Sequence, residues 1–465
     1  MRRQDKCIIV YAQLFLINFR VHKFYRMKKF LLIIFLLDIL LIANAQPKQT
    51  LSQRALPKTN RNQQQTSNHI LPGAYQTAEY IPLLKGKRVG VFANQTSVVG
   101  NTHLVDSLKK LHVNVVKIFS PEHGFRGNAD AGAKVKSYID PATGIQVISL
   151  YGSKVKPSGA DLNDVDVLLF DVQDVGVRFY TYISSLQYFI QSAIENNLPL
   201  IILDRPNPNG FYVDGPVLDT AFSSFVGMQP VPIVYGMTIG EYAKMLLGEK
   251  LLTWKDERKQ DGNVSLGKGS GFEDEHTNFK LIVIKCKNYT HKSRYILPVK
   301  PSPNLPGMSA IYSYPSTCLF EGTVLSEGRG TEHPFEIFGH PDLPDTLFSF
   351  TPRGTVGAAD PKLKDQKCYG WNIYGTDSNG TITELQLKWL LLAYKLFPDK
   401  EKFFIHPKKF NSNPQDFYFN KLAGNSELMQ QIIEKKSEAE IRASWQPKLE
   451  EFKKIRMKYL LYEDF

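Results

Sequence analysis

The chain has none of the glycine-rich loops that bind nucleotide phosphates. No G-x-G-x-x-G pattern follows its first apolar run, and no Walker A loop occurs in its 465 residues. Cysteine is scarce, because the chain has only Cys7, Cys286, Cys318 and Cys368 and no C-x-x-C pair. These absences argue against a dinucleotide- or ATP-binding enzyme, a disulfide framework and a zinc knuckle. We expect no cofactor and no metal site.

A dense stripe of Lys and Arg is also missing. The formal net charge is +12, but residues 1–45 contain eight Lys or Arg and two Asp or Glu, so the rest of the chain has 49 against 43, a net of +6. This mild excess argues against a nucleic-acid partner. It would help to attract an anionic polymer such as a cell-wall glycan.

Long apolar runs are absent except near the N-terminus. Met-Lys-Lys at 27–29 precedes an apolar run at 30–42, and Ala-Asn-Ala at 43–45 fits a cleavage site. The run is shorter than the roughly 20 residues that span a bilayer, so we predict a signal peptide at 27–45 rather than a membrane anchor. No Cys follows it for lipid attachment. Residues 1–26 are expected to be an upstream mis-start extension, and the mature protein to be exported, periplasmic or secreted.

The rest of the chain divides into three parts. Residues 46–70 are rich in Gln, Asn, Ser and Thr, which predicts a flexible tether. Over 71–255, apolar runs alternate with helical patterns such as 104–111 and 183–194, the rhythm of βαβ units. We predict an α/β fold with a Rossmann-like parallel sheet there, and a second, smaller α+β domain over 256–465.

The second half carries fewer clear signals. A strand-like run lies at 279–286, a helical pattern at 383–396, and a charged helical end at 426–462 that we expect to break near Pro447. The proline-rich residues 300–306 predict a rigid structural crossing between domains.

Polar side chains follow four apolar runs of the predicted sheet, at 88–94, 113–119, 165–171 and 198–204. Open α/β sheets bind ligands at the carboxyl ends of their strands. We therefore expect one shared cleft.

The second of these runs leads into residues 120–127 (Ser-Pro-Glu-His-Gly-Phe-Arg-Gly), which bring together an acid, an imidazole and a guanidinium. Glu122, partly shielded by Pro121 and Phe125, is our candidate proton donor, with His123 beside it. The alternatives are that Glu122 caps the next helix or pairs with Arg126, and that His123 only bonds to backbone.

The third run leads to two further carboxylates. Asp171 or Asp174 could activate water as a general base, or one of them could be buried against Arg178 as a structural pair. Tyr180 and Tyr182 could stack on a sugar ring or belong to the core.

The fourth run leads to residues 204–210 (Asp-Arg-Pro-Asn-Pro-Asn-Gly). Two prolines fix the backbone, while Asp204, Arg205, Asn207 and Asn209 present directional hydrogen-bonding groups. The segment predicts a sugar-binding loop, and the alternative is a turn whose Asn side chains cap local backbone.

Four segments together resemble the DUF1343 family of exo-β-N-acetylmuramidases: 120–124, 171–182, 204–210 and 321–331. The resemblance covers the chain from about residue 72 to residue 462. It implies an exo-acting glycosidase that releases N-acetylmuramic acid from the non-reducing end of peptidoglycan fragments, with a Rossmann-like catalytic domain and a smaller C-terminal domain that closes the cleft.

Such a reaction requires a proton for the leaving oxygen and normally a second group, and Glu122 is the expected general acid. The 3-O-lactyl carboxylate of muramic acid suggests a bidentate Arg contact, for which Arg178, Arg205 and Arg329 are candidates. The complete predicted site consists of the catalytic residues Glu122, His123, Asp171 and Asp174 and the substrate-binding residues Asn94, Arg126, Gln173, Arg178, Tyr180, Tyr182, Asp204, Arg205, Asn207, Asn209, Glu321, Ser326, Glu327 and Arg329.

Two other functions fit the same side chains. Oxygen and nitrogen ligands at strand ends could bind Mg²⁺ or Mn²⁺ in a phosphoesterase; these would be Glu122, His123, Asp171, Asp174 and Asp204. Alternatively, a two-domain periplasmic glycan-binding protein could close over its ligand without reaction. The expected partners are muramic-acid-terminated saccharides from peptidoglycan, with no nucleic acid and no stable membrane anchor.

Overall fold

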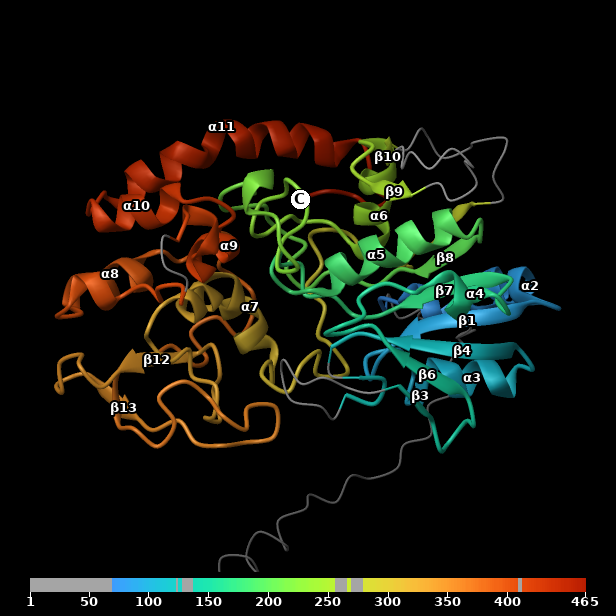
Figure 1. Cartoon of the computed structure of the whole chain (residues 1–465), viewed down its shortest axis with the longest axis horizontal. Coiled ribbons are helices and arrows are strands. Elements are labelled where there is room, and N and C mark those ends of the chain that lie inside the picture. The colour runs from blue at the N-terminus through green and yellow to red at the C-terminus, as the bar shows by residue number, and fades with distance from the viewer. Residues whose placement is uncertain (1–68, 123, 128–136, 256–265, 269–278, 409–411) are drawn as a thin grey trace, which may run out of the picture. The chain divides into compact units, whose positions relative to one another are not determined.

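A mostly parallel sheet forms the centre of the N-terminal half of the protein (Figure 1). The computed structural model describes residues 69–122, 124–127, 137–255, 266–268, 279–408 and 412–465. The predicted signal peptide, nearly all of the predicted tether and His123 lie outside these described residues. Residues from Asn68 onward form one compact unit.

The strand order of this sheet is β11-β8-β7-β1-β4-β6-β5, with β5 antiparallel to β6. The sheet consists of β1 (Arg88–Ala93), β4 (Asn114–Ser120), β5 (Tyr138–Ile139), β6 (Gln146–Ser149), β7 (Val167–Asp171), β8 (Leu200–Leu203) and β11 (Leu281–Ile284). Numbered along the chain, its six parallel strands have the order 3-2-1-4-5-6 of a Rossmann-like fold. This confirms the predicted α/β fold and its four predicted strands, while β6 was not predicted.

Helices cover both faces of the sheet. Alternate residues of each strand face opposite sides: in β1, Val89 and Val91 pack with α2 and α3, whereas Phe92 packs with α5. The helices and short strands of this half are α2 (Thr77–Leu84), β2 (Val98–Val99), β3 (Thr102–His103), α3 (Leu104–Lys110), α4 (Gly159–Leu162), α5 (Tyr182–Glu195), α6 (Ile239–Gly248), β9 (Thr253–Lys255) and β10 (Leu266–Lys268). Because β11 comes from beyond residue 255, the sheet includes part of the segment that we expected in the C-terminal domain.

The C-terminal half is a smaller α+β part with an antiparallel sheet of order β12-β14-β13. Its elements are α7 (Met308–Thr317), β12 (Ile337–His340), β13 (Phe348–Phe350), β14 (Cys368–Asn372), α8 (Lys388–Leu396), α9 (Tyr418–Ala423), α10 (Glu427–Ile433) and α11 (Glu438–Met457). This confirms the second domain class that we predicted. The helix expected at 383–396 begins only at Lys388.

The break that we predicted near Pro447 is wrong. Pro447 lies inside α11, and the chain breaks earlier, where Lys435 takes a φ of 60° and Ser437 caps α11 in a capping box with Glu440. A capped N-terminus starts a new helix at low cost, so the break falls at the cap rather than at the proline.

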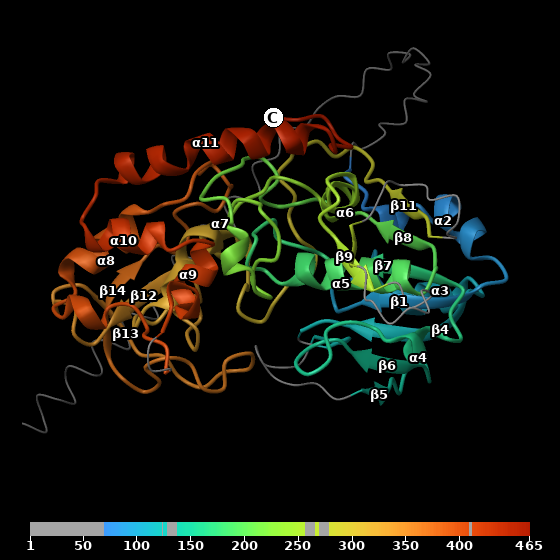
Figure 2. The ribbon, with the colours of Figure 1, turned by 45° about the horizontal axis from the view of Figure 1, so that its top comes forward.

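Helix α11 fastens the C-terminal end to the sheet half and runs along the top of the molecule in Figure 2. Arg442 donates to Asp214 Oδ2 at 3.0 Å, Arg456 Nε donates to the carbonyl of Gly236 at 2.8 Å, and the Tyr459 hydroxyl, just past the helix, donates to Glu249 at 2.7 Å. In the described part of the chain, no helix is both long and apolar enough to cross a membrane. Cys286, Cys318 and Cys368 are buried free thiols.

Candidate active site

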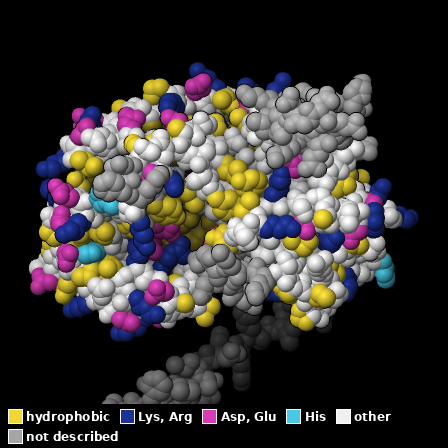
Figure 3. All heavy atoms as spheres, viewed as in Figure 1, with side chains coloured by type: hydrophobic (Ala, Val, Ile, Leu, Met, Phe, Trp, Pro, Cys, Tyr) yellow, Lys and Arg dark blue, Asp and Glu magenta, His cyan; other side chains and the backbone are white. Residues whose placement is uncertain are grey.

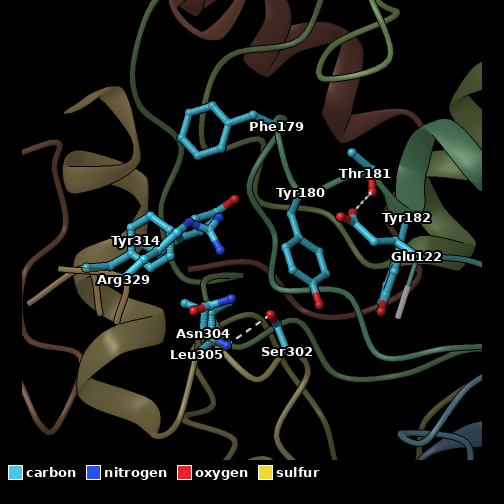
Figure 4. A pocket seen from close by; sticks show the side chains of 11 residues that line it. Glu122, Phe179, Tyr180, Thr181, Tyr182, Ser302, Asn304, Leu305, Tyr314 and Arg329 are labelled. Carbon is cyan, nitrogen blue, oxygen red and sulfur yellow. Dashed lines mark hydrogen bonds between the residues drawn. The ribbon is translucent and has the colours of Figure 1, made fainter. Parts of the chain in front are cut away.

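A pocket lies where the loops after β4 and β7 meet residues of the C-terminal half (Figure 4). The space between its atoms is about 420 Å³, part of which is open to solvent, and the centre of a water molecule can lie within about 60 Å³ of it. Its lining residues are Glu122, Phe179, Tyr180, Thr181, Tyr182, Ser302, Asn304, Leu305, Tyr314, Arg329 and Phe335. The space-filling view shows a hollow near the middle of this face, with hydrophobic side chains on its walls and charged side chains beside it (Figure 3).

Glu122 is the only carboxylate among the described residues that line this pocket. It comes two residues after the end of β4 and is half-buried. Thr181 Oγ1 donates a long hydrogen bond of 3.5 Å to Glu122 Oε2. Burial raises the pKa of the Tyr151 hydroxyl, and the nearby negative charge of Glu122 raises it further. The Glu122 carboxylate therefore accepts from Thr181 and lies close to a second hydroxyl group, that of Tyr151.

Aromatic rings form much of the pocket wall. The rings of Tyr180 and Tyr182 meet edge to face at 4.7 Å, and Tyr314 contacts Phe179 at 5.4 Å and Phe335 at 4.8 Å. Burial raises the pKa of both Tyr180 and Tyr182, so their hydroxyl groups stay neutral. Such a wall suits the apolar face of a sugar ring. The Tyr180 hydroxyl donates to the carbonyl of Pro301 at 2.8 Å and the Tyr182 hydroxyl accepts from Asn94 Nδ2 at 2.7 Å, so these contacts hold the two rings in place.

Arg329 is the basic group of the pocket, and Figure 4 shows it across Tyr180 from Glu122. Its Nη2 donates to Glu321 at 2.6 Å and its Nε lies 3.3 Å from Glu327. Burial alone would lower the pKa of Arg329, but these two carboxylates outweigh burial and raise it. Lys362 is 2.8 Å from Glu327 and completes the cluster. The guanidinium is therefore always charged and rigidly held.

The glycines beside Arg329 are required by the backbone. Gly328 and Gly330 have φ angles of 83° and 79°, a region that other residues rarely adopt. A Cβ at Gly328 would lie 2.3 Å from the carbonyl of Ile337, and a Cβ at Gly330 would lie 2.3 Å from that of Arg353. The two glycines therefore allow the tight turn that presents Arg329 to the pocket.

Asp171 and Arg205 do not line the pocket. Arg205 donates to both oxygens of Asp171, at 2.5 and 2.9 Å, and to the carbonyl of Val98 at 3.1 Å, while both ionised groups are almost fully buried. One alternative was that Asp171 or Asp174 is buried against Arg178 as a structural pair, but the partner of Asp171 is Arg205. The pair ties the end of β7 to the loop after β8.

Asp174 and Asp204 are also buried away from the pocket. Asp174 accepts from Gly176 N at 2.6 Å and from the Tyr235 hydroxyl. Asp204 accepts from Gly240 N at 2.8 Å and from the hydroxyl groups of Thr238 and Tyr462 at 2.7 and 2.6 Å. Burial raises the pKa of each aspartate to about 6. These contacts give both carboxylates a structural role.

Arg178 is fully buried and binds backbone rather than ligand. It donates to the carbonyls of Pro216, Val231 and Leu422 at 2.7 to 2.9 Å. Burial lowers its pKa to about 9, so it remains charged at neutral pH. The structure removes it from the candidates for the lactyl carboxylate.

The remaining predicted residues lie outside the pocket wall. Arg126 pairs with Asp140 and Asp106, and the other side chains bind neighbouring groups: Asn94 to Tyr182 and Thr96, Gln173 to the carbonyls of Asp174 and Pro206, Asn207 to Met237, Asn209 to Val175 and Ile311, and Ser326 to Gly328. The segment 204–210 therefore matches the turn alternative, in which Asn side chains bond to backbone.

Several pocket residues were not predicted. Ser302, Asn304 and Leu305 come from the proline-rich segment to which we gave a structural role, and Tyr314 comes from α7. A hydrogen-bonding Asn between fixed prolines was a usable signal for Asn304. Nothing in the local sequence distinguished Tyr314 or Phe335 from core aromatics.

The alternative function, a metal-dependent phosphoesterase, requires a cluster of metal ligands. Among the described residues, no three His, Cys, Asp or Glu side chains come together as metal ligands would.

The raised pKa of Asp174 makes stability depend on pH. Burial holds the pKa of Asp174 at about 6 in the folded state, above the ordinary value of 3.8. The folded state therefore binds the proton more tightly, and stability is lost as pH rises through 6. Relative to Asp174→Asn, the wild-type protein should lose about 1 kcal/mol of unfolding free energy between pH 5 and pH 7. Urea unfolding at both pH values measures this difference.

Asp166→Asn is the matched control. The hydrogen bonds of Arg88 hold the pKa of Asp166 at about 2, so this carboxylate stays ionised across the range and its variant should keep the wild-type slope. A wild-type slope in Asp174→Asn as well would contradict the assignment to Asp174.

Comparison with known proteins identifies the family. The models of exo-beta-N-acetylmuramidase NamZ match in order, the N-terminal one over residues 89–309 and the C-terminal one over 312–462. The peptidoglycan beta-N-acetylmuramidase NamZ of Bacillus subtilis (strain 168) is 38% identical over 405 residues, which are 83% of this chain and 89% of that protein.

Two crystal structures of DUF1343 family proteins from Bacteroides fragilis NCTC 9343 have similar folds. One is 41% identical with a TM-score of 0.71 and covers 85% of this chain and 100% of its own. The other is 28% identical with a TM-score of 0.67 and covers 85% and 99%. The chain therefore belongs to the exo-β-N-acetylmuramidase NamZ family.

Proposed function

We propose that this protein is an exo-acting glycoside hydrolase that releases N-acetylmuramic acid from the non-reducing end of peptidoglycan fragments, with Glu122 as general acid. The observation that carries the proposal is the position of Glu122, the only carboxylate among the described lining residues of an aromatic-walled pocket. The Bacillus subtilis relative, a peptidoglycan beta-N-acetylmuramidase, supports the choice of substrate.

In this mechanism, the muramic acid ring lies against the aromatic wall and Glu122 protonates the glycosidic oxygen. The bond from C1 to that oxygen breaks, the next sugar leaves with a new hydroxyl group, and water adds to C1 and returns a proton to the site. The hydrogen bond from Thr181 helps to keep the carboxyl group in place. Asp171 and Asp174 are committed to buried contacts, so neither is the second catalytic group in this proposal.

We assign recognition of the lactyl carboxylate to Arg329. Its Nη2 and Nε contact Glu321 and Glu327, and a guanidinium has five N–H donors, so Nη1 can donate to a ligand. The two carboxylates fix the plane of the guanidinium, which favours a directional contact. Glu321 and Glu327 thus position Arg329 rather than touch the sugar.

Substrate comparison tests the proposal. The wild-type protein should hydrolyse a chromogenic β-N-acetylmuraminide and leave the matching β-N-acetylglucosaminide nearly untouched. Arg329→Lys keeps the positive charge between the two glutamates but loses the planar donor, and should lower the ratio of the two kcat/KM values by about 10- to 100-fold. Arg88→Lys, at an exposed ion pair, should keep the wild-type ratio. Equal rates on both substrates in the wild type would overturn the proposal.

We also propose that the protein acts outside the cytoplasm, because its predicted signal peptide and its proposed substrate agree. N-terminal sequencing of the protein recovered from cell fractions tests this: a start at Gln46 in an extracytoplasmic fraction is expected, and an uncleaved cytoplasmic protein would contradict it.

A further inference from the structure

Three half-buried aromatic residues form a strip that begins beside Glu122. The ring of Phe225 lies 6.3 Å from that of Tyr151 at a tilt of 56°, and 6.3 Å from that of Tyr188 at 14°, nearly parallel. Tyr151 follows β6, Tyr188 belongs to α5, and Phe225 lies in the loop between β8 and α6. We call these three residues the aromatic strip.

Two independent connections join the strip to the catalytic acid. The hydroxyl of Tyr151, at one end of the strip, lies close enough to Glu122 for the charge of that carboxylate to raise its pKa. Thr181, which also bonds to Glu122, is the N-cap residue of α5, and Tyr188 lies seven residues further. Residues seven apart share one face of a helix, so α5 leads from the acid to the far end of the strip.

Packing of the core does not account for the exposure of these rings. Helix α5 buries every residue from Tyr182 to Ile194 except Tyr188. Phe225 and Tyr151 are likewise only half-buried. Large aromatic side chains on buried elements normally become part of the core, whereas adjacent half-buried ones leave ring surface that a ligand can cover.

The loop that carries Phe225 is held rigidly. Ser224 and Gly227 exchange two backbone hydrogen bonds, at 2.9 and 3.0 Å, and leave Phe225 and Val226 at the tip of the turn. Beneath the turn, a Cβ at Gly227 would lie 2.8 Å from Leu218 and 3.3 Å from the buried Arg178 side chain. The turn therefore presents Phe225 in a fixed position, which lowers the entropy cost of binding.

We propose that the aromatic strip binds the leaving part of the substrate, the N-acetylglucosamine unit attached to the terminal muramic acid. This inference rests on the proposed function. A general acid must reach the oxygen shared by the two sugars, so the leaving sugar begins at Glu122 and extends away from the pocket. The strip begins at the same carboxylate, and its rings offer stacking faces with two phenol hydroxyls for the polar edge of a sugar.

The test compares two substrates that differ only in the leaving group. For the disaccharide N-acetylmuramyl-β-1,4-N-acetylglucosamine, Phe225→Ala should lower kcat/KM by about 10-fold, the value of one aromatic contact. For β-N-acetylmuramyl fluoride, whose leaving group is a single atom, the same variant should stay within about twofold of the wild type. Tyr188→Ala should show the same selective loss.

Two further variants guard against a folding artefact. Phe225→Leu keeps most of the apolar volume but loses the flat ring, so it should fold normally and still lose disaccharide activity selectively. Phe348→Ala removes an exposed aromatic of β13 and should change neither rate. An equal loss on both substrates, or no loss on the disaccharide, would overturn the inference. A wild-type protein inactive on both substrates would instead refute the proposed function, and the strip's role with it.

Discussion

Replacement of Glu122 by Gln is expected to lower kcat on the disaccharide by at least about 10²-fold, the usual scale of general acid catalysis. The amide keeps the size of the side chain and can still accept from Thr181, but it has no acidic proton to deliver to the glycosidic oxygen. Fluoride leaves with little help from an acid, so activity on β-N-acetylmuramyl fluoride should fall much less. This contrast identifies the missing step as protonation.

Glu79→Gln is a matched control for this variant. Glu79 is an exposed residue of α2 whose contact is a 3.5 Å ion pair with Lys287, so its removal should leave both rates unchanged. Wild-type disaccharide hydrolysis by Glu122→Gln would remove Glu122 from the mechanism. An equal fall on both substrates would show that Glu122 acts by holding the pocket together.

Replacement of Asp171 by Ala should destabilise the protein by about 3–5 kcal/mol, because it leaves the Arg205 guanidinium buried without its partner. If Asp171 were instead a catalytic base, its loss would abolish activity with little effect on stability. Urea unfolding, with activity measured per folded molecule, separates the two. We expect a large loss of stability and retained activity.

The double variant Asp171→Leu with Arg205→Met keeps this prediction testable if the single variant does not fold. Replacement of both ionised groups by apolar ones of similar volume removes the unpaired charge, so the double variant should be more stable than Asp171→Ala alone. A stable but inactive double variant would return Asp171 to the list of catalytic residues.

The predictable part of the fold depended on repeated apolar runs. The strands β1, β4, β7 and β8 each carry four or more apolar residues between polar ends. This pattern is typical of a parallel strand that is buried on both faces. Strand β6 (Gln146–Ser149) has only two apolar residues, Val147 and Ile148, between polar ends, which is too few to stand out. With it we missed Tyr151, the residue of the aromatic strip that lies beside Glu122.

The sequence predicted which edge of the sheet carries the site, but it did not predict which side chains line the pocket. Polar residues do end several strands at one edge, but the depth of each depends on loops that come from distant parts of the sequence. Asp171 is covered because Arg205 of the next loop reaches it, whereas Glu122 borders open space. Part of the pocket wall comes from the other half of the chain: Ser302, Asn304, Leu305 and Tyr314. No local sequence pattern predicts contacts between segments that lie so far apart in the chain.

The pocket takes part of its wall from the second half of the chain. Arg329 reaches the pocket only through its tight turn, and α11 holds that half against the sheet through Arg442 and Arg456. The family models match both halves in order, in agreement with a site built from both.

The most direct test of the account is a crystal structure of Glu122→Gln with the disaccharide bound. The account predicts the glycosidic oxygen within about 3 Å of the side chain at position 122, the muramic acid ring in the pocket with its lactyl carboxylate at Arg329, and N-acetylglucosamine on Phe225 and Tyr188. A saccharide bound elsewhere, with its glycosidic oxygen out of reach of position 122, would contradict it.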